Sequence, residues 1–442
     1  MLRNLPPAAR LALGLLLLVV LGTTALMLPG VSATQPLTWS EALFTAVSAL
    51  SVTGLSIILP GRDLTLFGQI ILMVLIQIGG VGFMAMTVVI LHLIGRRVTY
   101  SDRIALRDSL GLVDMPAIMR FTKRILQLVI TIELIGAFLL WLHWRATLGD
   151  AQAIFYALFH SISAFCNAGF DLFAGVNGAV GIPNDGMTLT VLGALIVLGS
   201  LGMPVLFDLW DYREHHRVTL HTRLTVGVVA ALIILGTVGF FLAETRPAGV
   251  LVNEPFHRQV VLSIFHSVAT RTAGYSALSN FEDLTPPGQL LKMALMFIGS
   301  APSSMGGGIT TGTFTVLLLA LWSYIRSKEA TIVLGRTIPS DTIRRAAAVL
   351  TLSLGVVFLA TWSILVTHPH ATLDQVLFEV ISAFATCGFS LAFTTELNLF
   401  GQLVISFVMF WGRLGALTVA VALAGSPKRE LINYPEAQVL IG

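Results

Sequence analysis

Charged residues and cysteines are both scarce in this chain. Only 11% of its 442 residues are Asp, Glu, Lys or Arg, whereas 55% are hydrophobic, and the mean hydropathy is +0.87. A soluble domain carries about 25% charged residues, so this chain has too few to cover a water-facing surface. The two cysteines, Cys166 and Cys387, give no disulfide framework. The composition therefore predicts a polytopic protein of the lipid bilayer, and the net charge of +3 gives no indication of a nucleic-acid partner.

Long apolar segments follow one another along the chain. Each approaches or exceeds the ~20 residues that a transmembrane helix needs. The first run follows Arg3 and Arg10 like a signal peptide, but it is longer than the roughly 7–15 apolar residues of a signal sequence. We therefore interpret it as a retained first helix. The segments lie at 10–28, 66–94, 123–143, 187–209, 223–243, 289–324 (interrupted), 346–367 and 398–424.

The eight long segments form four consecutive pairs, and a shorter apolar stretch lies between the two members of each pair. The shorter stretches cover 39–53, 151–168, 256–273 and 373–387 and are too short to cross a bilayer at about 1.5 Å per residue. Each ends in a tip that contains a glycine, within "SVTGL", "FCNAGF", "TRTAGY" and "FATCGF". The chain therefore reads as four copies of helix, short helix, tip and helix.

The predicted fold is an all-α membrane protein with four pseudo-symmetric helix–pore-loop–helix repeats around one central pore. We expect repeats at 1–94, 95–212, 213–326 and 327–425, followed by a cytoplasmic tail at 426–442. The expected pore loops are 39–57, 151–172, 256–277 and 373–391, with an additional intramembrane loop at 299–314.

Basic residues indicate the orientation. They concentrate at the N-terminus, in the loops 95–124, 210–223 and 325–345, and in the tail. The face that carries the tips has few, namely Arg62, Arg145, Arg246, Arg258, Arg271 and Lys292. Positively charged loops stay on the cytoplasmic side, so both termini are expected in the cytoplasm and the tips open outward.

The tips have the composition of a cation site. A short helix that ends halfway across the membrane directs its partially negative C-terminal carbonyls toward the centre. Glycine permits backbone conformations that expose consecutive carbonyls, and rings of carbonyls replace the hydration shell of K+ in channels. The alternative is that these glycines cap helices in packing loops. The expected filter residues are Val52, Thr53, Gly54, Asn167, Ala168, Gly169, Thr272, Ala273, Gly274, Thr386, Cys387 and Gly388.

The segment "GSAPSSMGGGITTGTF" at 299–314 interrupts the sixth span and is the predicted gate. Pro302 lacks a backbone donor, and each glycine costs roughly 1 kcal/mol relative to alanine in a helix. A broken helix persists in a membrane only where its backbone faces water or polar partners. A kink that serves helix packing is the alternative. The expected gate residues are Ser303, Ser304, Gly306, Gly307, Gly308, Thr310, Thr311 and Arg413.

Three ionisable residues within apolar segments require partners. We expect Arg271 to point behind the filter and to support it by binding carbonyls or an acid. Arg413, in the last span, is expected below the filter near the 299–314 loop, because a charge at this depth usually faces a cavity or a partner. Glu133 could serve helix packing or function, and the sequence favours neither.

These motifs, together with the glycine-rich loop and Arg413, give a resemblance that covers essentially the whole chain. It resembles the KtrB-type membrane subunit of bacterial Ktr potassium uptake systems, within the Trk/Ktr/HKT superfamily. The resemblance implies K+ as the transported ion, a homodimer in the bacterial cytoplasmic membrane, and a cytosolic RCK-type ring that binds the regulatory nucleotide. Thr310 stands where relatives usually carry lysine, and Cys387 is unusual before the fourth glycine.

Other functions remain as alternatives. A sodium-selective or sodium-coupled transporter of the same superfamily would share these features, although all four tips keep the glycine whose first copy is serine in sodium-preferring plant relatives. An unrelated secondary transporter would more often show paired halves. A hydrolase using Ser303 or Ser304 lacks a suitably spaced histidine, so no enzyme activity is expected. No GxGxxG pattern follows a strand, so nucleotide control would need a separate subunit, docking on the basic loops and the tail.

Overall fold

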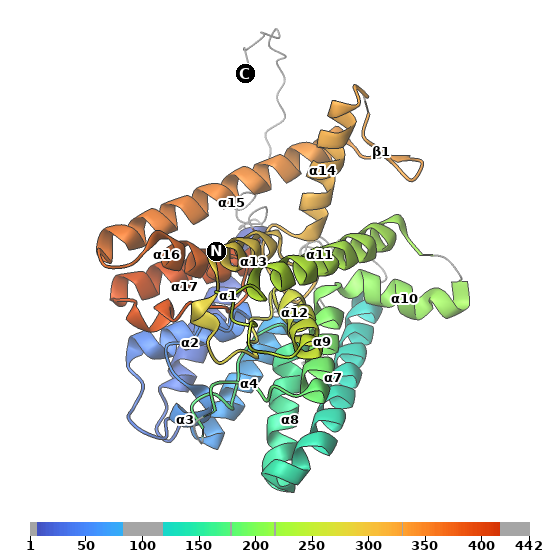
Figure 1. The fold of residues 1–442 in the computed structure, drawn as a ribbon. Helices are drawn as coiled ribbons and strands as arrows, with labels where there is room; N and C mark the ends of the chain where they lie inside the picture. The colour runs from blue at the N-terminus through green and yellow to red at the C-terminus, as the bar shows by residue number, and fades with distance from the viewer. Residues whose placement is uncertain (1–6, 83–117, 177–178, 216–217, 329, 416–442) are drawn as a thin grey trace.

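The structure is a computed structural model, and it describes residues 7–82, 118–176, 179–215, 218–328 and 330–415. The secondary structure of these residues is mainly helical, with loops between the helices (Figure 1). The elements are α1 (Pro7–Leu26), α2 (Trp39–Ser51), α3 (Pro60–Asp63), α4 (Leu66–Val81), α7 (Ile118–Leu148), α8 (Asp150–Phe165), α9 (Gly186–Ser200), α10 (Met203–His215), α11 (Leu220–Glu244), α12 (Phe256–Ala269), η2 (Phe281–Asp283), α13 (Pro286–Ile298), α14 (Thr311–Ile325), β1 (Ile332–Val333), β2 (Arg336–Thr337), α15 (Ser340–Thr367), α16 (Leu373–Phe384), η3 (Phe393–Glu396) and α17 (Leu399–Leu414).

Four copies of one unit make up the fold, as predicted. Each copy has a long first helix (α1, α7, α11 or α15), a short pore helix (α2, α8, α12 or α16), a tip, and a second helix (α4, α9, α13 or α17). Within α7, α11 and α15, the ranges Arg124–Leu148, Leu220–Glu244 and Ser340–Thr367 are long and apolar enough to cross a membrane. The first helix α1 contributes a shorter apolar stretch, Ala12–Leu26.

The second helices start in the same way. Thr65, Thr285 and Asn398 each accept a hydrogen bond from the backbone N–H of the glycine three residues later, at the starts of α4, α13 and α17. The next residue is a glutamine in all three, and its amide donates to the carbonyl of the residue before the cap. In α9, Asp185 caps the backbone N–H groups of Met187 and Thr188. These shared caps align the four second helices residue by residue.

The four units are arranged in a closed ring. The second helix of each unit packs against the pore helix of the next: α4 against α8, α9 against α12, and α13 against α16. The last helix, α17, returns to α2 and closes the ring. In Figure 1 the blue α2 therefore lies beside the red α17, although the two helices are at opposite ends of the chain. The second half of each pore helix is buried, because neighbouring helices enclose it.

The span expected at 187–209 is not one straight helix. It consists of α9 and α10, which meet at an angle of 101°. Gly202, at the break, has φ +85°, and a Cβ on it would lie 2.6 Å from the carbonyl oxygen of Pro302. The break therefore makes room for the loop between α13 and α14, which is the predicted interruption of span 289–324.

One small sheet lies outside the predicted helices. A small antiparallel hairpin, with Ile332 opposite Thr337 and Val333 opposite Arg336, lies between α14 and α15 and was not expected. The ends of spans 66–94 and 398–424, most of the basic loop 95–124 and the tail 426–442 lie outside the described residues.

Candidate functional site

The four tips share one backbone conformation. Two positions before each glycine, a residue with a side chain adopts positive φ: Val52 (52°), Asn167 (57°), Thr272 (70°) and Thr386 (50°). The glycines themselves, Gly54, Gly169, Gly274 and Gly388, have φ of 87°, 66°, 66° and 95°. Non-glycine residues rarely adopt this region, and such strain persists only where the surrounding structure imposes it. We call residues 52–54, 167–169, 272–274 and 386–388 the tip ring.

Each tip glycine lies against a carbonyl of the next tip. A Cβ on Gly54 would lie 2.3 Å from the oxygen of Ala168, and one on Gly169 would lie 2.3 Å from that of Ala273. The same measurement gives 2.1 Å between Gly274 and the oxygen of Cys387. Glycines and carbonyl oxygens therefore alternate around the ring, in chain order.

Serine hydroxyls support three of the four tips. Six residues before the glycine, Ser48 and Ser382 accept hydrogen bonds of 3.1 Å from the backbone N–H groups of Gly54 and Gly388. In the second tip, Ser163 donates instead to the carbonyl of Phe170, at 3.0 Å. The third repeat has Val268 at this position, so its tip needs other support.

Arg271 is part of that support. Its side chain is only 1% exposed and donates through Nη2 to the carbonyl of Leu295, in the last turn of α13, at 3.0 Å. Its own backbone carbonyl accepts hydrogen bonds from Asn167 (2.9 Å) and Ser300 (3.2 Å). The guanidinium thus faces the partially negative C-terminal end of a helix behind the ring.

A cavity of about 440 Å³ opens on one side of the tip ring. All four tip glycines line it, together with residues that follow them in the chain. Two carboxylates, Asp171 and Glu282, also belong to its wall. Asp171 is held by the imidazole of His160, whose Nε2 lies 3.0 Å from the carboxylate, and by the backbone N–H of Phe173 at 2.7 Å. The cavity therefore combines backbone carbonyls with fixed negative charge.

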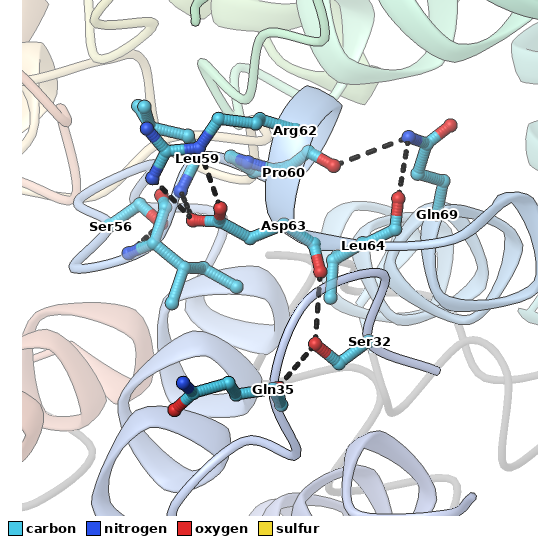
Figure 2. A network of polar contacts seen from close by, with 10 residues as sticks. Ser32, Gln35, Ser56, Leu59, Pro60, Arg62, Asp63, Leu64 and Gln69 are labelled. Atoms are coloured by element: carbon cyan, nitrogen blue, oxygen red, sulfur yellow. Dashed lines mark hydrogen bonds and ion pairs between the residues drawn. The ribbon is translucent and has the colours of Figure 1, made fainter. Parts of the chain in front are cut away.

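Figure 2 shows how one wall of this cavity is held. Asp63 accepts a hydrogen bond from the backbone N–H of Leu59 and one from Nε of Arg62, both at 2.8 Å. Its backbone carbonyl accepts another from Ser32, before α3 and α4. Gln69 of α4 donates to the carbonyls of Pro60 and Leu64. Since Leu59 and Pro60 line the cavity, this network fixes the wall contributed by the first repeat.

On the opposite side of the ring lies the α13–α14 loop. A Cβ on Gly306 would lie 1.8 Å from Oγ1 of Thr272, and one on Gly307 would lie 2.8 Å from Oγ1 of Thr386. The loop is thus in direct contact with the third and fourth tips. Gly308 has φ +85°, and Thr310 caps α14 by accepting from the backbone N–H of Thr313.

The same loop reaches across to the second repeat. The backbone N–H of Ala301 donates to the carbonyl of Ser200 at 3.0 Å, and that of Met305 donates to Gly199 at 3.2 Å. The backbone N–H of Met203 donates in turn to the carbonyl of Ser303, at 3.1 Å. Among the described residues, the buried hydroxyls of Ser304 and Thr311 have no hydrogen-bond partner.

Arg413 connects this loop to the first repeat. From α17, its Nη1 donates to the carbonyl of Met305 at 2.5 Å. Its Nη2 donates to the carbonyl of Gly80, at 3.1 Å, and also to that of Gly79, near the end of α4. The guanidinium therefore links repeats one, three and four beneath the ring.

Sequence reasoning misjudged one residue and missed two. Lys292 was counted among the loop-associated basic residues on the face that carries the tips, but its side chain is buried in α13, with 1% exposure. Glu379 and His160 occupy the same position in α16 and α8, nine residues before the glycine, and both contact residues that line the cavity. Glu133 is buried and accepts from Gln77 at 3.0 Å.

Comparison with known proteins gives full-length similarities. The sequence profile of the TrkH family, described as cation transport protein, matches residues 15–432. The Ktr system potassium uptake protein B of Vibrio alginolyticus is 35% identical over 426 residues, covering 96% of this chain and 92% of that protein. Its namesake in Bacillus subtilis is 35% identical over 441 residues, covering 100% and 97%.

Two further similarities extend this result. The potassium/sodium uptake protein NtpJ of Enterococcus hirae is 34% identical over 446 residues, covering 100% of this chain and 98% of that protein. The crystal structure of the potassium transporter TrkH from Vibrio parahaemolyticus superimposes with a TM-score of 0.74, covering 95% of this chain and 84% of that one. At 16% identity, this second match supports the shared fold alone.

Proposed function

Because the chain belongs to the TrkH family of cation transport proteins, we propose that it takes up potassium through the tip ring. The observation that carries the proposal is the closed alternation of tip glycines and carbonyl oxygens. Oxygens converging on one axis replace the water around a dehydrated monovalent cation. The proposed filter therefore consists of the tip-ring residues.

The charges around the ring support cation entry. Asp171 and Glu282 on the cavity wall raise the local concentration of cations. The pore helices α2, α8, α12 and α16 end at the ring, so their partially negative C-terminal ends face the proposed site. This arrangement of negative charges and helix ends would not favour an anion or a neutral solute.

We infer that the α13–α14 loop is the gate. It contacts two tips on the side opposite the cavity and is fastened by Arg413 to the first repeat and by backbone hydrogen bonds to the second. An ion that leaves the ring on this side meets the loop. A packing kink alone would not require contacts with the second and fourth repeats and, through Arg413, a link to the first. The proposed gate residues are those expected from the sequence, with Met305 added as the acceptor of Arg413.

The assembly and orientation are also proposals. We propose that the cavity faces outward and both termini face the cytoplasm of a bacterial inner membrane, as the basic loops indicate. The name "Ktr system" of two relatives supports a complex with other subunits. As the resemblance to KtrB-type subunits implies, we propose a homodimer that binds a cytosolic nucleotide-binding ring of the RCK type. Repeat boundaries at 1–94, 95–212, 213–326 and 327–425 belong to the same proposal.

One experiment tests the function. Liposomes that contain the purified protein are loaded with K+ or Na+. The flux of each ion is then measured separately and in competition with the other ion. We expect K+ flux that exceeds Na+ flux. Equal or greater Na+ flux would favour the sodium-selective or sodium-coupled alternative. The name of the potassium/sodium uptake protein NtpJ is the reason to test it. Empty liposomes and protein with serine at all four tip glycines are the controls, and absence of K+ flux from the parent overturns the proposal.

A further inference from the structure

Lys292 breaks the fourfold pattern at a buried position. It lies seven residues after the cap Thr285, in α13. The residues seven after the caps Thr65, Asp185 and Asn398 are Leu72, Leu192 and Ile405. All three are aliphatic and have no exposed surface, and Lys292 is 1% exposed. At this position, three of the four repeats therefore have an aliphatic side chain, and the third repeat has a lysine.

The ammonium of Lys292 sits in a box of aromatic rings. Its Nζ lies 4.1 Å from the ring centre of Phe389, 4.9 Å from that of Phe240 and 5.0 Å from that of Phe281. The fourth wall is His266, whose Nδ1 is 3.3 Å from Nζ. Ring faces stabilise a cation most strongly where water is excluded. The box is thus built to hold a positive charge rather than to fill space with one more aliphatic chain.

No carboxylate among the described residues forms an ion pair with this ammonium. Glu244 of α11 is the acidic group on this side, but its oxygens accept hydrogen bonds from Thr285 and from the backbone N–H of Val250. The other titratable groups that face Lys292 are His266 of α12 and Cys387 of the fourth tip. Among the described residues, this amine therefore contacts the aromatic rings and His266, and no carboxylate is one of its contacts.

The ammonium is close to the proposed filter. Phe389, its nearest ring, directly follows Gly388, and the carbonyl of Cys387 lies against Gly274 in the tip ring. The amine of Lys292 thus lies immediately behind the junction of the third and fourth tips of the filter. A charge in a region of low dielectric acts over several ångströms, and it opposes the binding of another cation.

We propose that Lys292 is a positioning residue that sets the affinity of the filter for its cation. It holds a positive charge behind the fourth tip and so weakens cation binding enough for rapid release into the inner half of the pore. Conduction requires binding that is favourable enough for entry and weak enough for exit. The inference rests on the proposed function, because it assigns to Lys292 a role in the same filter.

If Lys292 has only a packing role, the expected effect of substitutions is different. If Lys292 only fills the space between α11, α12 and the fourth tip, a side chain of similar length without charge will preserve transport. Lys292→Met is that replacement, because methionine is unbranched and adapts to irregular core space. Lys292→Arg keeps the charge and changes the shape. Comparing Lys292→Met with Lys292→Arg therefore distinguishes an effect of the charge from an effect of packing.

The test measures K+ flux in liposomes over a series of K+ concentrations, for the parent, Lys292→Met, Lys292→Gln and Lys292→Arg. We expect the K+ concentration for half-maximal flux to fall about tenfold in both neutral variants, the size of effect of one unit charge acting through a protein interior. Maximal flux falls as well, because K+ leaves more slowly. Lys292→Arg keeps the parent values. Leu192→Met, at the equivalent position of the second repeat, is the matched control and also keeps them.

A second readout uses detergent-solubilised protein without any flux. The unfolding temperature rises with K+ if the folded protein binds it, and the half-saturating concentration reports affinity. It should fall in the neutral variants as the half-maximal concentration for flux does. Unchanged values in both assays, or equal shifts in Lys292→Met and Lys292→Arg, overturn the inference while leaving the proposed function intact. If only the neutral variants fail to fold, Lys292 is structural. A parent with neither K+ flux nor K+ stabilisation overturns both proposals.

Discussion

A Cβ on Gly388 would lie 2.3 Å from the carbonyl oxygen of Thr53, so the last repeat meets the first through bare backbone. These residues are more than three hundred positions apart in the chain, and no side chain fits between them. The contact closes the tip ring. It also makes the ring sensitive to the smallest possible addition at any of its glycines.

The first prediction concerns those glycines. Serine at Gly54, Gly169, Gly274 or Gly388 adds a Cβ at positive φ against a carbonyl, with a strain of about 1–3 kcal/mol. We expect K+ over Na+ preference in liposome flux to fall by about tenfold, since about 1.4 kcal/mol corresponds to that ratio. Gly227→Ser is the matched control, because a Cβ there meets nothing within 4 Å. Four single variants with parent selectivity would exclude these residues from the filter.

The second prediction concerns the gate. Deleting 304–311 removes the loop segment that contacts Thr272 and Thr386. K+ flux should rise severalfold and depend less on the cytosolic partner, because the obstruction beneath the ring is gone. The measurement is flux in liposomes with and without the partner complex, after size-exclusion chromatography has shown that the shortened protein is monodisperse. A folded deletion that conducts no more than the parent means that this loop is not the gate.

The third prediction concerns the hydrogen bonds by which Arg413 holds the α13–α14 loop. Arg413→Lys keeps the charge but cannot supply the forked set of donors that reaches Met305 and Gly80 together. We expect higher basal K+ flux and a loss of stability of about 1–3 kcal/mol, since a buried carbonyl loses its donor. Arg145→Lys, at the exposed end of α7, is the control. Flux and unfolding temperature equal to those of the parent would show that the loop is held by its backbone contacts alone.

The fourth prediction is a dependence on pH. Asp185 caps α9 outside the membrane span. Partial burial acts to raise the pKa of Asp185, but hydrogen bonds from Thr188 and the nearby His143 outweigh it, so the pKa lies below the ordinary 3.8. A lowered folded-state pKa contributes stability above the unfolded value, and that contribution is lost as pH falls through the folded one.

The unfolding temperature of the parent should therefore decline below about pH 4 more steeply than that of Asp185→Asn. Asparagine keeps the cap but does not titrate, so it is the matched variant. Asp185→Ala should lose about 1 kcal/mol at neutral pH. Identical acid profiles of the parent and Asp185→Asn would contradict the assignment.

The repeats were predictable from the sequence because their signal is local. A short apolar stretch that ends in a glycine is visible within twenty residues, and it recurs four times. The bend between α9 and α10 was not, because it depends on hydrogen bonds from Ala301 and Met305 to residues about a hundred positions away. Gly202 alone did not distinguish a bend from an ordinary helical glycine.

The burial of Lys292 was missed for a different reason. Basic residues were assigned to faces by their nearest loops, and Lys292, in the middle of α13, was assigned with the loop that precedes this helix. Alignment of the helix caps would have corrected this, since "TLFGQ", "TPPGQ" and "NLFGQ" fix the register of α4, α13 and α17. Arg413 is similar. Its depth in an apolar helix indicated polar partners, but carbonyls of Met305 and Gly80 cannot be identified from a sequence, because backbone acceptors carry no residue signature.

The closed ring is built by one polypeptide, so its four sectors are genetically independent. A channel assembled from four identical chains changes at every sector when one codon changes. Here a substitution alters a single sector, and combining Gly54→Ser, Gly169→Ser, Gly274→Ser and Gly388→Ser yields a graded series from one altered contact to four. The slope of selectivity along that series would measure how much each quarter contributes to ion discrimination, and whether the quarters act separately or together.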